Sequence, residues 1–102
     1  IEANPNEVNA FILLGNLYSN LGRYAEAEGQ YKEALKINKL DPSIYVLIAN
    51  VYFMNGEIER ALHSYRATVN LRPENDEYKL VFIQVLEDFI NDFRKDDVVA
   101  EI

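Results

Sequence analysis

The sequence repeats itself at a spacing of 34 residues, and this period constrains the fold more than any other feature. Identical residues recur at that distance in the first three quarters of the chain. They include Leu13 and Leu47, Asn16 and Asn50, Tyr18 and Tyr52, Gly22 and Gly56, Ala27 and Ala61, and Tyr31 and Tyr65. A fixed period of this length indicates stacked supersecondary units, each of which buries its apolar face against its neighbours. Such arrays usually present binding surfaces, so we expect binding and no enzymatic activity.

The spacing of apolar residues predicts two amphipathic helices in each unit. In the first unit, residues 11, 14, 15 and 18 fall on one helical face. Gly22 is suited to end this helix, because glycine adopts the left-handed terminating conformation without steric cost. A second helix follows, and we expect its inward side chains to be Tyr24, Ala27, Tyr31, Ala34 and Leu35.

The second unit has the same layout. Asp41 and Pro42 form an N-cap followed by proline at the first helical position. The first helix ends at Asn55–Gly56, and the second ends before Pro73. Small residues stand where the helices of a pair should cross, which allows the two backbones to approach closely. These residues are Gly15, Ala27, Ala49 and Ala61.

This pattern resembles the tetratricopeptide repeat family. The first unit carries the resemblance with Phe11, Leu14, Gly15, Tyr18, Gly22, Tyr24, Ala27, Tyr31 and Ala34, and the second with Tyr45, Ile48, Ala49, Tyr52, Gly56, Ala61, Tyr65, Val69 and Pro73. Lys39 replaces the usual closing proline of the first repeat, and Thr68 replaces the usual alanine of the second. The resemblance implies an all-α, right-handed superhelical array of antiparallel helix pairs, with repeats at 8–41 and 42–75.

The ends of the chain complete a single predicted domain of residues 1–102. Residues 1–6 fit the tail of a preceding repeat or an N-terminal cap. Residues 76–93 begin a third repeat and then depart from the pattern, which predicts a capping helix that ends near Phe93, before an acidic tail at 94–102. One face of this helix should cover the second repeat through Tyr78, Phe82, Val85, Phe89 and Phe93.

The capping helix is apolar on its other sides too, which predicts burial on both sides. The residues concerned are Leu80, Ile83, Leu86 and Ile90. Either Val98, Val99 and Ile102 fold back over them, or a second copy of the chain covers them. A simple capping helix and a helix used for dimerisation or docking are both open interpretations.

The resemblance implies that the first helix of each pair lines a concave peptide groove. The inward positions are Asn9, Ile12, Asn16, Ser19, Asn20, Val46, Asn50, Phe53, Met54, Leu80, Gln84, Glu87 and Asp88. Asn16, Asn50 and Gln84 form an amide ladder that could pair with the backbone of a bound peptide. Alternatively, Asn16 and Asn50 only solvate the groove or bond to neighbouring helices.

A known ligand mode of the family is a clamp for the C-terminal carboxylate of heat-shock chaperones. Asn16 matches one clamp position, but Ile12, Leu47, Glu77 and Val81 occupy the others. Glu77 would repel a carboxylate, so this mode is not expected.

Composition excludes several other classes of function. The net charge is −7, and residues 74–102 alone have a net charge of −6. This charge argues against nucleic acid and favours a basic partner or a solvating end. There is no cysteine, and the single histidine, His63, should be an exposed surface residue, so we expect no metal and no cofactor. Asp88, Asp92 and Asp96 lack the turn glycine of a calcium loop.

We therefore expect a protein–protein interaction module that acts as a scaffold, adaptor or assembly factor. The alternatives are a self-association module that pairs through its C-terminal helix, or a regulatory fragment of a larger multidomain protein. We expect a soluble protein with no membrane insertion by this segment, in the cytoplasm or, alternatively, the periplasm.

Overall fold

A computed structural model describes the backbone of residues 5–101 and the side chains of residues 6–92. In this part of the chain the regular structure is helical throughout. The helices are α1 (Pro5–Asn20), α2 (Tyr24–Ile37), α3 (Pro42–Met54), α4 (Ile58–Leu71) and α5 (Asp76–Glu101).

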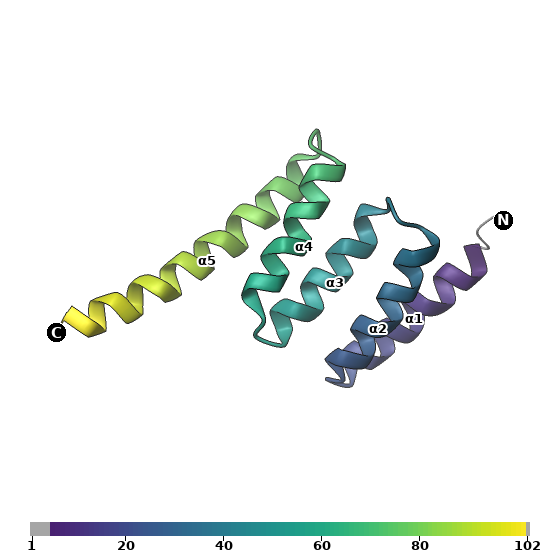
Figure 1. Ribbon diagram of the computed structural model, residues 1–102, viewed down its shortest axis with the longest axis horizontal. Coiled ribbons are helices and arrows are strands. Elements are labelled where there is room, and N and C mark those ends of the chain that lie inside the picture. Colours follow the sequence, from purple (N-terminus) through teal and green to yellow (C-terminus); the bar gives the residue numbers. More distant parts are fainter. Residues whose placement is uncertain (1–4, 102) are drawn as a thin grey trace.

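The helices stack in the order of the sequence. Each one packs against the helix before it and the helix after it, from α1 to α5. Figure 1 shows them as a row in which consecutive helices run in opposite directions, with α1 behind α2 and α5 at the far end. The array measures 59 × 33 × 17 Å. The predicted all-α array of antiparallel helix pairs is confirmed.

Glycines end the first helix of each pair, as predicted. Gly22 and Gly56 have φ angles of 76° and 79°, in the left-handed region. The backbone N–H groups of the following residues, Arg23 and Glu57, then donate to the carbonyls of Tyr18 and Tyr52 at 2.9 and 2.8 Å. These bonds satisfy carbonyls at the helix end that no helical N–H reaches. The two turns are therefore copies of one another.

Helix α3 begins with the predicted cap. The Asp41 carboxylate accepts hydrogen bonds from the backbone N–H of Ser43 at 2.9 Å and from the Ser43 hydroxyl at 2.6 Å. Pro42 occupies the first turn, where its missing N–H costs nothing. Helices α2 and α4 have no such side-chain cap at Arg23 and Glu57.

The core lies between the helices of each pair and at the α2–α3 junction. Ala27, Ala49 and Ala61 are fully buried, as expected for residues at helix crossings, and Tyr31 and Ile44 are almost completely buried. Thr68, which stands in place of the usual alanine, is also buried, and its hydroxyl donates to the Ser64 carbonyl at 3.1 Å. The threonine is tolerated because this bond satisfies its only donor.

The predictions for the two ends need correction. Pro5 and Asn6, which were expected in a tail or cap segment, belong to the first turn of α1. Helix α5 does not end near Phe93 but continues to Glu101, so most of the expected acidic tail is helical. The physical reason is that no glycine or proline follows Pro73 in the sequence, so nothing interrupts the helix.

Within a single copy of the chain, α5 is buried on one side only among the side chains that the structure describes. Val85 is 7% exposed and Phe82 packs against the core, as predicted for the covering face. The side chain of Phe93 lies outside the described residues. Leu80, Ile83 and Ile90, in contrast, are exposed. Val98 and Val99 cannot fold back over them, because both belong to the same uninterrupted helix, while Ile102 lies outside the described residues.

Candidate functional site

The side chains of α1 and α3 frame a hollow of about 380 Å³. Five residues predicted for the groove line it: Asn16, Ser19, Asn20, Asn50 and Met54. Three residues that were not predicted also contribute, namely Tyr31, Leu47 and Val51. The first helices of the two repeats therefore lie close enough to line one hollow together.

A tyrosine from the second helix of each pair holds the asparagine of the first. The Tyr31 hydroxyl donates to the amide oxygen of Asn16, and the Tyr65 hydroxyl donates to the amide oxygen of Asn50. The two pairs are related by the 34-residue period. The interpretation that these asparagines bond to neighbouring helices is thus correct for their oxygen atoms.

The hydroxyls of Tyr31 and Tyr65 are protonated at neutral pH, so both hydrogen bonds are retained there. Burial raises the pKa of Tyr31 and of Tyr65 above its ordinary value of 10.0, so both hydroxyls remain donors. Because each amide oxygen accepts from a tyrosine, the NH₂ groups of Asn16 and Asn50 are the donors left for a ligand in the hollow. The groove wall therefore offers two oriented hydrogen-bond donors.

The third member of the amide ladder is held differently. The side-chain nitrogen of Gln84 donates to the Asp88 carboxylate at 3.2 Å, within α5. Residue 99 is a valine where Tyr31 and Tyr65 stand in the repeats, so no tyrosine is available at that position. Gln84 and Asp88 are exposed and line neither of the concave hollows.

The remaining predicted groove residues are spread over a wider area. Val46 lines a second, smaller hollow of about 120 Å³, which Tyr65, Thr68, Glu77, Tyr78 and Val81 complete. Asn9, Ile12, Phe53, Leu80 and Glu87 lie outside both hollows. The structure thus brings six of the predicted residues to hollows and leaves the others on the surrounding surface.

A different arrangement occurs at the junction of α2 and α3. The Tyr52 hydroxyl donates to Glu28 Oε1 at 2.8 Å, and Lys32 Nζ lies 2.6 Å from the same oxygen. Burial alone would raise the pKa of the Glu28 carboxyl, but the hydrogen bonds from Lys32 and Tyr52 outweigh it and hold this pKa below 4.5. The guanidinium of Arg60, on α4, lies 5.8 Å from the centre of the Tyr52 ring. Tyr52 is only 8% exposed, so its side chain fills the space at this junction.

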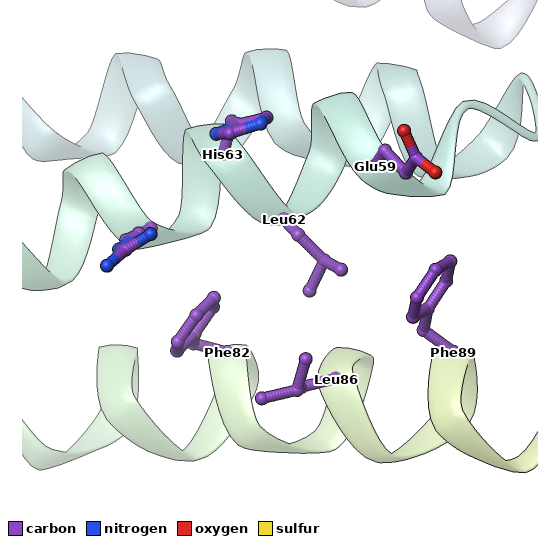
Figure 2. Close-up of a pocket in the computed structure, with 7 residues that line it drawn as sticks. Glu59, Leu62, His63, Phe82, Leu86 and Phe89 are labelled. Carbon is purple, nitrogen blue, oxygen red and sulfur yellow. The ribbon is translucent and has the colours of Figure 1, made fainter.

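The junction of α4 and α5 is open in comparison. Figure 2 shows Leu62 of α4 pointing toward α5, and Phe82 and Phe89 of α5 pointing back, around a hollow of about 340 Å³. Leu86 completes the apolar lining, and the rim is formed by Glu59, His63 and Arg66. His63 is exposed, as predicted, although its position beside a hollow was not.

Comparison with known proteins identifies the family to which the chain belongs. A family model described as TPR repeat matches residues 15–56, and one described as tetratricopeptide repeat matches residues 42–75, the range predicted for the second repeat. Together they cover more than half of the chain. This chain belongs to the tetratricopeptide repeat (TPR) family. The all-α solenoid fold follows from this membership and agrees with the helices described above.

Several curated proteins contain segments similar to this TPR chain. It is 31% identical to BBSome complex member BBS4 of Mus musculus over 63% of its own length and 12% of that protein. It is 35% identical to the human protein O-mannosyl-transferase TMTC1 over 76% of its length and 9% of that protein. Photosystem I assembly protein Ycf3 of Synechococcus is 38% identical over 72% of the chain and 44% of that protein. The chain thus spans less than half of each of these relatives.

Two solved structures share the TPR fold. The thermophilic TPR protein TTC0263 of Thermus thermophilus superposes with a TM-score of 0.75 at 25% identity, over 81% of this chain and 42% of that one. The first TPR of Spaghetti (RPAP3), bound to the HSP90 peptide SRMEEVD, gives a TM-score of 0.70 at 17% identity, over 89% and 75%.

The described residues form neither a membrane-spanning helix nor a cluster of metal ligands. No helix there is both long and apolar enough to cross a membrane. Among the side chains of residues 6–92, no three histidine, aspartate or glutamate groups gather as a metal site would require. Asp88 and Asp92 therefore form no cation site with a third described carboxylate.

Proposed function

We propose that this TPR domain binds a segment of a protein partner in the concave groove between α1 and α3, as a scaffold, adaptor or assembly factor. The observation that carries the proposal is the repeated pair of an asparagine and a tyrosine at Asn16–Tyr31 and Asn50–Tyr65. Arrays of this fold generally serve as non-catalytic interaction modules, and the RPAP3 domain of the same fold holds a peptide.

The two asparagines would recognise the backbone of the ligand. Each lines the hollow and has its amide oxygen bound by a tyrosine, so its NH₂ group would be the donor to the ligand. Backbone carbonyls are present in every peptide, so this contact gives affinity with little dependence on sequence. Pre-orientation by Tyr31 and Tyr65 lowers the entropy lost when the ligand binds.

Apolar and charged residues beside the asparagines would select among ligands. Met54 lines the hollow, and Phe53, which precedes it in the sequence, is 39% exposed, so both could bury apolar side chains of the partner. Glu77, which lines the second hollow, disfavours an acidic segment. We therefore expect a neutral or basic segment with apolar side chains, bound with a Kd on the order of micromolar.

The proposal can be tested with peptides selected from a random displayed library against the wild-type domain. A selected peptide is then titrated against an Asn16→Ala/Asn50→Ala variant, a Met54→Arg variant and an Asn70→Ala control, with helicity checked by circular dichroism. Asn70 is an exposed asparagine of α4 outside the groove hollows, so it matches the substitution but not the place.

We expect at least ten-fold weaker binding by the groove variants and unchanged binding by the control. Equal affinity of all four proteins for every selected peptide would disprove groove binding. The Met54→Arg variant guards against misreading lost stability as lost contact, because Met54 is 55% exposed and contributes little to the core.

A further inference from the structure

Helix α5 carries a stripe of large apolar side chains on its outer side. We name Ile83, Leu86 and Ile90 the outer stripe. By the 34-residue period they correspond to Gly15, Tyr18 and Gly22 in the first repeat, and to Ala49, Tyr52 and Gly56 in the second. Ile83 therefore stands where α1 faces α2 and where α3 faces α4. Leu86 takes the position of Tyr52, which bonds to Glu28 of α2 and lies beneath Arg60 of α4.

In both repeats a following helix covers this position. Gly15 lies against the ring of Tyr31 of α2, and Ala49 is fully buried beneath α4. On α5, Ile83 is 48% exposed and Ile90 is 40% exposed. Figure 1 shows α5 at the end of the row, with α4 on one side and no described helix on the other. In this molecule, therefore, the element that covers the equivalent position is an α-helix in both repeats.

The open hollow between α4 and α5 adjoins the outer stripe, because Leu86 belongs to both. At the corresponding junction of α2 and α3, Tyr52 fills the space and bonds to Glu28. The period places Leu86 at the position of Tyr52 and Leu62 at that of Glu28. Two leucines cannot reproduce that hydrogen bond, and they leave an apolar hollow of about 340 Å³ (Figure 2).

Helix α4, which covers α3, also extends over the junction of α2 and α3. Arg60 of α4 lies over the ring of Tyr52, at 5.8 Å from its centre. A helix placed on the outer stripe in the same way would set the equivalent residue over the hollow. Since that hollow is lined by Leu62, Phe82 and Leu86, a large apolar side chain fits there better than arginine.

Ile83 sets a size limit on the same helix. In the first repeat the facing residue is Tyr31, and it fits because Gly15 has no side chain. An isoleucine at this crossing leaves no room for a tyrosine at that separation. The covering helix must carry alanine or glycine opposite Ile83.

The charge of α5 argues against a second copy of the chain as the occupant. Residues 76–92 hold five acidic residues and one lysine, so two such helices would repel one another. The same charge attracts a helix with basic residues on its polar side.

We propose that the outer stripe and the adjoining hollow bind an amphipathic, basic helix of a partner protein. The geometry of α4 specifies its pattern: a large apolar residue over the hollow and, five positions later, alanine or glycine against Ile83, as Arg60 and Tyr65 are spaced in α4. This surface is distinct from the concave groove, and binding at it does not depend on the groove being functional.

The test uses the protein's own α4 as the probe. A synthetic peptide of residues 57–72 carries Arg60→Phe and Tyr65→Ala, with Glu57→Lys and Glu59→Lys added to make it basic. A control peptide carries the same changes except Tyr65→Ala. Both are titrated into the ¹⁵N-labelled chain and followed by NMR, which detects millimolar binding and locates it. We expect the first peptide to bind at least ten-fold more tightly, with shifts at Leu62, Ile83 and Leu86 and not at Asn16 and Asn50.

Two variants of the chain check the geometry. Leu62→Glu/Leu86→Tyr rebuilds the closed α2–α3 junction in the hollow, and we expect it to weaken the first peptide at least ten-fold. Ile83→Ala should reverse the preference between the peptides. A Met54→Arg groove variant should bind both as the wild type does, which separates this proposal from the preceding one.

Four results would overturn the proposal: no saturable shifts for either peptide, equal affinity for both peptides, unchanged binding by the rebuilt junction, or shifts confined to the groove. Sedimentation of the unliganded chain provides a further check. A stable dimer that Ile83→Asp dissociates would identify a second copy as the occupant instead of a partner helix.

Discussion

Gly15 lies directly against the ring of Tyr31, and no side chain could stand between them. A β-carbon added to Gly15 would come within 2.5 Å of Cε1 and 2.7 Å of Cδ1 of that ring. Tyr31 is only 2% exposed, so the ring has no free space into which it can move. The contact also aims the tyrosine hydroxyl at Asn16, and thus connects helix packing in the first repeat to the wall of the groove.

This contact predicts opposite effects for two glycine-to-alanine substitutions. Gly15→Ala should destabilise the domain by about 1–3 kcal/mol, because the methyl group overpacks the crossing. Gly29→Ala is the matched control: Gly29 is also helical, nothing lies within 4 Å of its added β-carbon, and the gain in helix propensity should stabilise by roughly 0.5–1 kcal/mol. Urea unfolding measures both, and a shift of the same sign in the two variants would contradict the packing argument.

The Tyr65–Asn50 pair should behave as a coupled unit. Asn50→Ala leaves the hydroxyl of a tyrosine that is 5% exposed without its acceptor, so we expect a loss of about 1–3 kcal/mol. After Tyr65→Phe the same substitution should cost less, since the hydroxyl is gone. A double-mutant cycle from denaturant unfolding gives the coupling energy, and a value near zero would show that the hydrogen bond contributes no stability.

Glu28 predicts a specific loss of stability in acid. Its pKa in the folded protein is lower than the ordinary value of 4.5, so the unfolded chain takes up the proton first and acid favours unfolding. The stabilisation is complete above about pH 4.5 and disappears as the pH falls through the folded pKa. Relative to wild type, Glu28→Gln should lose roughly 0.2–1 kcal/mol at pH 7, and this difference should shrink as the pH falls below 4.5. Unfolding free energies measured across that range test this, and a difference independent of pH would refute it.

The cap of α3 predicts a local loss. Asp41→Ala removes the acceptor of the Ser43 N–H and should cost about 0.5–2 kcal/mol. Asp41→Asn is the conservative control, because asparagine caps nearly as well and should retain most of the stability. Thermal unfolding would expose an error if alanine and asparagine lowered the midpoint equally.

The elements of the fold were predictable because their signals are local. Gly22, Gly56 and the Asp41–Pro42 pair each specify a helix end through their own backbone chemistry, and the structure has helix ends at all of them. The far end of α5 was predicted too early. That prediction relied on the period of the repeats, but the sequence after Pro73 contains no residue that stops a helix.

The site was predictable only in part, because its geometry depends on contacts between helices. The period identified Asn16 and Asn50 as equivalent positions, yet it did not show that their oxygens face Tyr31 and Tyr65. A signal was present, since each asparagine precedes its tyrosine by 15 residues in both repeats. The hollow between α4 and α5 had a weaker signal, namely the replacement of Glu28 and Tyr52 by two leucines one period later.

The stepwise order of contacts, in which each helix touches chiefly the helices next to it in sequence, makes the length of this molecule adjustable. A further 34-residue unit inserted between Leu40 and Asp41 would keep the α1–α2 and α3–α4 pairs intact and would form the α2–α3 type of junction twice. Duplication of one gene segment would then lengthen the groove without redesign of any existing interface. The short concave surface described here is thus one size in a series that the same sequence rules can extend.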